Sequence, residues 1–193
     1  SSFVYLQGSE LKNRVVFYDF SEIGKNVPNR LVGGFDDEFQ GDMVPRVTYM
    51  GNPYSCAFSG KALTFFSSRN LASPELVEQR NIEERIDSVF YSDEYAAAIV
   101  RNTNGEYGSR LEVYKKDGTH VLSKEFNFEY THADFDGDLI ILYNEESCRI
   151  YNMSGTEKFD ATFDFPVSKI RKGRFPGTLV VTGPQQMQEL KLR

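Results

Sequence analysis

Three aspartates at alternate positions form the most metal-like stretch of this sequence. Asp134, Asp136 and Asp138 lie in the run DFDGD. Carboxylate oxygens are the hard ligands that Ca²⁺ prefers, so these three side chains are the candidate metal ligands. The pair Asp136-Gly137 is also typical of a tight turn, which gives a β-turn without metal as the other interpretation. An EF-hand loop has its glycine in the sixth position, whereas here it is fourth, so no EF-hand is predicted.

The two histidines offer little for catalysis. His132 precedes Asp134 by two residues, so strand alternation places both on one face and permits a His–Asp contact. No serine or cysteine in an activating motif accompanies them. His120 follows a turn at Gly118 and is expected to be exposed. We therefore predict no catalytic residue, no cofactor-binding residue and no cofactor.

The two cysteines are Cys56 and Cys148, far apart and outside any C-x-x-C motif. Such spacing excludes a zinc site and a disulfide framework. One disulfide between them is conceivable, and two buried free thiols are the favoured interpretation.

Composition narrows the classes of partner. The 193 residues carry a net charge of −6, which provides no broad attraction for nucleic acid or anionic lipid. We expect no nucleic-acid partner. One local basic cluster (Lys169, Arg171, Lys172 and Arg174) is best explained as a solvated strand and turn. No apolar run approaches the ~20 residues that span a bilayer.

A repeated segment predicts the architecture. Four stretches of alternating apolar residues end on an aromatic residue: 14–18 (RVVFY), 62–66 (ALTFF), 110–114 (RLEVY) and 148–151 (CRIY). Their last residues are 48, 48 and 37 positions apart. A fainter copy is present at 187–190. Aromatic and β-branched residues in alternation are typical of strands.

The surroundings of this segment repeat as well. Asp117-Gly118 and Ser154-Gly155 follow two of the copies, and such pairs close hairpins because glycine accepts positive φ. Two further strand candidates precede each hairpin, for example 86–91 and 95–100. Residues 75–84 are the one helical candidate, and analogy with the later hairpins favours a strand there. Gly33-Gly34 lacks a phosphate-loop motif and predicts a bulge or a kink.

Each unit therefore consists of four short strands, close to the length of a propeller blade. The predicted fold class is an all-β β-propeller with four-stranded blades of the WD40 or quinoprotein type, although the absence of Trp departs from the standard WD40 pattern. A β-sandwich is the alternative, but it needs no recurring four-strand unit. We assign the whole of 1–193 to this domain or fragment, with a partial blade at 1–40, blades at 43–83, 86–128 and 130–165, and a partial blade at 167–193.

These units do not add up to a closed ring. The first unit starts with its second strand and the last ends with its third, which gives an incomplete propeller of about four to five blades. Since the chain begins with Ser1, we expect a processed form or a fragment of a longer protein. Open blade faces are expected to be adhesive, so a homodimer through them is a further expectation.

Several segments resemble a known family: 14–20 (RVVFYDF), 30–35 (RLVGGF), 88–91 (SVFY), 124–128 (KEFNF), 150–159 (IYNMSGTEKF) and 189–192 (ELKL). The family is an uncharacterised domain-of-unknown-function group of membrane-anchored, propeller-like proteins from Gram-positive gut bacteria, and the chain is similar to its C-terminal part. The resemblance implies an extracytoplasmic protein that is membrane-anchored at full length, the tether belonging only to a longer precursor. It carries no catalytic motif, so it implies no site residue.

Strong repeats without reactive chemistry favour a non-catalytic binding or scaffold module that recognises a protein, peptide or glycan through blade loops or the channel. The first alternative is an enzyme of glycosidase or lyase type, in which carboxylates such as Asp87, Asp134 and Asp164 converge from several blades. The second alternative is a calcium-stabilised structural module. The identity of the partner does not follow from sequence, because fold alone does not determine function.

Overall fold

The computed structural model describes residues 2–7, 10–19, 30–35, 44, 46–102 and 106–192. Over these ranges the chain contains strands and no helix. No helix in this part has the length and apolar composition that a bilayer crossing requires. The strands are β1 (Ser2–Gln7), β2 (Glu10–Tyr18), β3 (Leu31–Phe35), β4 (Arg46–Tyr49), β5 (Tyr54–Phe58), β6 (Ala62–Ser67), β7 (Glu75–Asn81), β8 (Ile86–Tyr91), β9 (Tyr95–Arg101), β10 (Ser109–Lys115), β11 (His120–Phe126), β12 (His132–Asp136), β13 (Leu139–Tyr143), β14 (Ser147–Asn152), β15 (Glu157–Thr162), β16 (Lys169–Lys172), β17 (Thr178–Thr182) and β18 (Met187–Lys191).

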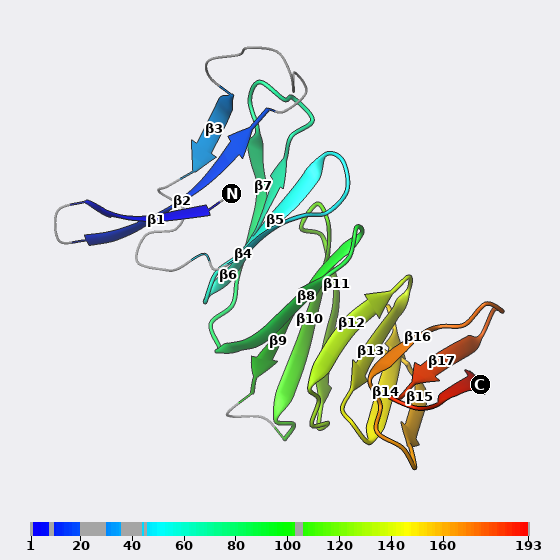
Figure 1. Ribbon diagram of the computed structural model, residues 1–193. Coiled ribbons are helices and arrows are strands. Elements are labelled where there is room, and N and C mark those ends of the chain that lie inside the picture. Colours follow the sequence, from blue (N-terminus) through cyan, green and yellow to red (C-terminus); the bar gives the residue numbers. More distant parts are fainter. Residues whose placement is uncertain are drawn as a thin grey trace.

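These strands form five antiparallel sheets, each a meander of consecutive strands. The first sheet is β1–β3, the second β4–β7, the third β8–β11, the fourth β12–β15 and the fifth β16–β18. In Figure 1 the sheets follow one another in chain order, with the first and the fifth at opposite ends of an open row. Over the described residues the fold is thus all-β, with propeller-like sheets in an open row that is consistent with the predicted incomplete propeller.

A bulge recurs at one position of the repeat. Wherever a third strand of a unit pairs with a fourth, the register shifts just before the terminal aromatic residue, namely Tyr18, Phe66, Tyr114 or Tyr151. The extra residue of the outer strand is Val32, Val77, Val121 or Lys158. A bulge increases local twist, so the outermost strand of each sheet turns in the same way. The bulge expected near Gly33-Gly34 is confirmed, one residue earlier, at Val32.

The outermost strand of the second sheet contains most of the segment 75–84, which was the one helical candidate in the sequence. Residues 75–81 pair with β6 as β7, which confirms the strand. Three turn glycines adopt the positive φ expected of them: 82° at Gly118, 62° at Gly137 and 77° at Gly155. The hairpins predicted from Asp-Gly and Ser-Gly pairs are therefore present.

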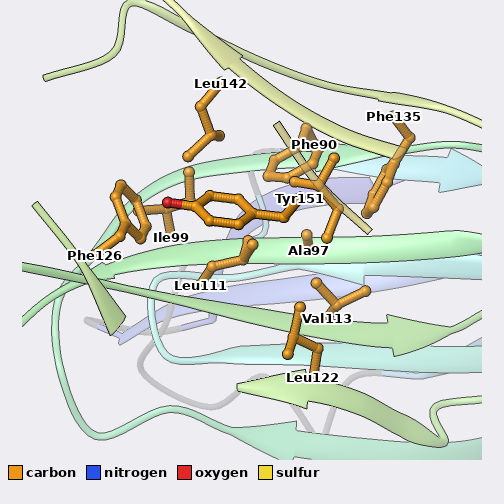
Figure 2. Close-up of a cluster of buried hydrophobic side chains, with 11 residues drawn as sticks. Phe90, Ala97, Ile99, Leu111, Val113, Leu122, Phe126, Phe135, Leu142 and Tyr151 are labelled. Carbon is orange, nitrogen blue, oxygen red and sulfur yellow. The ribbon is translucent and has the colours of Figure 1, made fainter. Parts of the chain in front are cut away.

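Hydrophobic layers between successive sheets hold the row together. All five residues of β13 are buried, because the two sides of its sheet face different neighbours. Ile140 and Leu142 contribute to the layer between the third and fourth sheets, whereas Leu139, Ile141 and Tyr143 contribute to the next. Figure 2 shows the former layer, with the ring of Tyr151 in its middle. Each sheet is thus stabilised by the sheets beside it.

Candidate functional site

The structure places the three candidate metal ligands against the fifth sheet. Lys169 Nζ lies 2.6 Å from Asp134 Oδ2, and the backbone N–H of Lys172 donates to Asp136 Oδ2 at 2.5 Å. Lys172 Nζ also donates to Asp138 Oδ1. No group of three or more metal-type side chains occurs in the described ranges. Two ion pairs and one backbone hydrogen bond therefore join β12 and its turn to β16.

Pairing with Lys172 makes Asp138 sensitive to acid. The hydrogen bond from the Lys172 ammonium lowers the pKa of this carboxyl below its ordinary 3.8. A lowered pKa in the folded state stabilises the fold above the ordinary value, and this contribution is lost as pH falls through the folded pKa. The Asp138 side chain is 75% exposed, so solvent screening limits the gain to about 0.5 kcal/mol or less.

We expect Lys172→Met to lower the melting temperature slightly near neutral pH, with a difference from wild type that shrinks as pH falls below roughly 4. Thermal melts between about pH 7 and pH 2 measure this difference. A difference that stays constant down to the lowest pH would show that Asp138 gains nothing from Lys172.

No hydrogen bond or ion pair joins His132 to Asp134, both of which lie in the described part of the chain. Its ring stacks on Tyr143, with centroids 4.8 Å apart, and its Nδ1 lies 2.9 Å from the hydroxyl of Thr131. The permitted His–Asp contact is therefore absent, because aromatic stacking on the paired strand positions the imidazole instead. His120 has a side chain 46% exposed, as expected, and lies 3.2 Å from Glu112 Oε2.

Glu112 is the centre of a polar cluster that sequence reasoning missed. Its carboxylate, 11% exposed, accepts hydrogen bonds from Arg110 Nε at 2.6 Å and Ser123 Oγ at 2.9 Å. Arg110 also pairs with Glu84 at 2.7 Å, which lowers the pKa of Glu84. A Ser–His–acid relay needs the imidazole between the other two groups, whereas here Ser123 and His120 both contact the acid. The cluster is consequently structural. Its only signal in the sequence was a pair of opposite charges, Arg110 and Glu112, two residues apart on one strand.

Both cysteines are free and fully buried, which confirms the favoured interpretation. Burial raises the pKa of the Cys148 thiol to about 12 and that of Cys56 well above its ordinary value. Thiolate is the reactive form, so neither side chain is poised as a nucleophile.

We predict that neither thiol reacts with a disulfide reagent such as DTNB in the native protein near pH ~8, and that both react after unfolding in guanidinium. Absorbance of the released thiolate counts them. Rapid reaction of a thiol without denaturant would contradict the buried positions.

The carboxylates proposed to converge lie against separate cavities. Asp87 borders one beside Arg101, Asp134 another beside Arg171, and Asp164 a third. Asp87 is also held by Arg101 at 3.1 Å and by Arg85 at 3.3 Å. These three aspartates do not share a cavity in the described part of the chain.

An open groove lies between the third and fourth sheets. Its volume is about 500 Å³, and its walls come from β11, β14 and β15 and from Tyr107 in the connection before β10. A second cavity of about 460 Å³ adjoins it, since Phe126 and Asn127 line both. Asn127 Oδ1 accepts a hydrogen bond from the N–H of Gly108 at 2.6 Å and so fixes the connection that carries Tyr107. We call the two adjoining cavities the Asn127 groove.

Positions along strands explain how the side chains reach this groove. Lys124 lies opposite Leu111 across β10 and β11, on the face toward the fourth sheet, and its ammonium is 5.6 Å from the centroid of the Tyr151 ring. Arg149 of β14 donates to Asn127 O at 3.2 Å and to Asp160 at 3.0 Å, and lies over the ring of Phe128. Its Nε, 3.5 Å from Glu157, is buried without a hydrogen bond.

Charges along the Asn127 groove are largely neutralised by one another. Arg149 is paired with Asp160, and Arg101 with Asp87. Glu125 accepts a hydrogen bond from Asn102 at 3.0 Å. The arrangement presents hydrogen-bonding groups and holds no activated nucleophile, so it is suited to binding.

Comparison with solved structures supports the fold alone. The computationally designed protein Ika4 aligns at 7% identity over 80% of this chain and 94% of its own, with a TM-score of 0.51. A functionally unknown protein from Desulfotomaculum acetoxidans DSM 771 aligns at 10% identity with a TM-score of 0.54, over 93% of this chain and 62% of its own. Hsv2 of Kluyveromyces lactis aligns at 9% identity over 79% of this chain and 46% of its own, with a TM-score of 0.48 that is too low to establish a shared fold. Curated proteins gave no match. A family model described as "Family of unknown function (DUF5711)" matches residues 1–192.

Proposed function

Since the chain belongs to the DUF5711 family, which has no known function, we propose from geometry that it is a non-catalytic binding or scaffold module. The observation that carries the proposal is the Asn127 groove, two adjoining cavities of about 500 and 460 Å³ in which Arg149 and Arg101 are each paired with a carboxylate. Binding sites are concave and carry a few fixed polar groups, as this groove does. A catalytic site needs groups of shifted pKa poised to react, and the buried thiols and paired aspartates are not so poised.

A combined activity and binding experiment tests this function. We expect purified protein to release no product from a panel of glycosidase, lyase, esterase and oxidoreductase substrates. We also expect it to retain ligands from immobilised glycans or displayed peptides. Turnover that Asp87→Asn, Asp134→Asn or Asp164→Asn abolishes would establish the enzyme alternative instead.

The recognised partner is proposed to lie outside the cytoplasm. The family resemblance supports this location and a membrane tether in a longer precursor. Protease treatment of intact cells that make the full-length protein is the test. Cleavage without lysis is the expected result, and protection until lysis would place the domain inside.

Self-association through the end sheets is also proposed. β18 pairs only with β17 among the described strands, and Met187 of β18 and Phe175 in the β16–β17 connection are 71% and 62% exposed. An unpaired strand edge with exposed apolar side chains favours pairing with a second copy. Light scattering after size exclusion should therefore give twice the chain mass of 22.1 kDa, and a monomer across concentrations would refute the dimer.

A further inference from the structure

The Asn127 groove has walls that identify a chemical class of ligand, an inference that rests on the binding function proposed above. Phe126 and Tyr151 belong to its walls, yet each is only 2% exposed. Peptide-binding grooves usually contain pockets for apolar side chains, and these two rings are already covered by the core. The exposed aromatic surface comes from Tyr107, which is 38% exposed.

The ion pairs of the Asn127 groove further restrict the chemical class of its ligand. The guanidinium groups of Arg149 and Arg101 are each held by an aspartate, at 3.0 and 3.1 Å. A phosphate, an acidic peptide or a nucleic acid would have to compete with these carboxylates. A neutral ligand would leave every pair intact and need no such exchange.

Unused hydrogen-bonding groups remain along the same walls. Lys124 has a ring contact with Tyr151 but no ion pair, and the Tyr107 hydroxyl and the Asn127 amide nitrogen have no hydrogen-bond partner in the described ranges. Glu157, with its side chain 46% exposed, lies with Oε2 3.5 Å from Arg149 Nε, and its other carboxylate oxygen adds an acceptor. Donors and acceptors beside an exposed ring match a molecule whose many hydroxyls both donate and accept.

We propose that the Asn127 groove binds a neutral oligosaccharide, with Tyr107 as the stacking surface and Lys124, Asn127 and Glu157 as hydrogen-bonding partners. The two adjoining cavities, of about 500 and 460 Å³, provide room for more than one sugar unit. The fixed ion pairs of Arg149 and Arg101 hold the walls in place, so little ordering is required on binding.

Titration of the whole chain with cellohexaose, xylohexaose, maltohexaose and chitohexaose tests the proposal. We expect one of them to bind, seen by calorimetry and by ¹H–¹⁵N shifts of the Gly108 N–H and the Asn127 side-chain amide. Tyr107→Ala should weaken that binding about tenfold or more, because the stacking surface is lost. Tyr49→Ala is the matched control, since Tyr49 is 64% exposed on β4 and lies outside the groove, and it should leave the affinity unchanged.

The other outcomes are separable. Absence of binding by all four hexasaccharides, or binding that Tyr107→Ala does not weaken, overturns the oligosaccharide site. Selection of phage-displayed dodecapeptides whose binding Tyr107→Ala abolishes would assign the groove to peptides and leave the general binding function standing. Hydrolysis of a bound hexasaccharide would instead refute the non-catalytic function while retaining the site.

Discussion

Tyr151→Ala is expected to destabilise the protein by about 3–5 kcal/mol, the range for removing a fully buried aromatic ring. Tyr151 is 2% exposed, and its ring occupies the layer between the third and fourth sheets among Ile99, Leu111 and Phe126 (Figure 2). Neighbouring side chains come from two sheets, so the cavity cannot close by movement of a single strand. Urea unfolding followed by circular dichroism measures the loss.

Tyr151→Phe is the matched control because it keeps the ring and removes only the hydroxyl. We expect that change to cost about 1 kcal/mol or less, the usual net contribution of one hydrogen bond. Equal losses for the two variants would show that the hydroxyl, rather than the packed ring, joins the sheets. A negligible loss for Tyr151→Ala would mean that the two sheets are not held by this layer.

Gly118→Ala should cost more than Gly177→Ala by about 1–3 kcal/mol. Both glycines have positive φ, 82° and 70°, so an alanine at either position carries similar backbone strain. A Cβ at Gly118 would lie 2.5 Å from the Cβ of Glu78 and 3.0 Å from Phe65 Cδ2, whereas a Cβ at Gly177 meets nothing within 4 Å. The difference therefore measures how tightly the β10–β11 turn is pressed against the second sheet.

Thermal or urea unfolding of the two variants side by side measures this difference. The hydrogen bond from Arg80 Nε to Gly118 O, at 2.9 Å, holds the turn against β7. Moving the turn away to make room for an added methyl group would therefore break this hydrogen bond. Equal stabilities for the two variants would show that the second and third sheets can separate at this turn without loss.

Local pattern sufficed for the strands and the turns. Residues 86–91 were predicted as a strand and are β8, and Gly118 and Gly155 adopt the positive φ that their hairpins require. A strand alternates with period two and a tight turn needs glycine, and both requirements act over a few neighbouring residues. The antiparallel meander within each sheet follows from the same short connections.

Contacts between residues that lie far apart in the sequence could not be predicted from local pattern. Asp134, Asp136 and Asp138 have the spacing of metal ligands, but Lys169 and Lys172, more than thirty residues later, satisfy them. His132 lies in a strand with Asp134, as predicted, yet its ring stacks on Tyr143. Periodicity states which face a side chain occupies and says nothing of what the opposite sheet presents there.

The Asn127 groove illustrates the same division. Its residues belong to all four strands of the third sheet, to β14 and β15 and to the connections beside them, and none carries a motif. The sequence by itself determined the repeating strands, the turn glycines and the absence of a recognisable catalytic motif, because each depends on local conformation or composition. Only the tertiary structure decided which charges pair and where a groove opens, since those depend on how neighbouring sheets stack and which side chains they bring within a few ångströms.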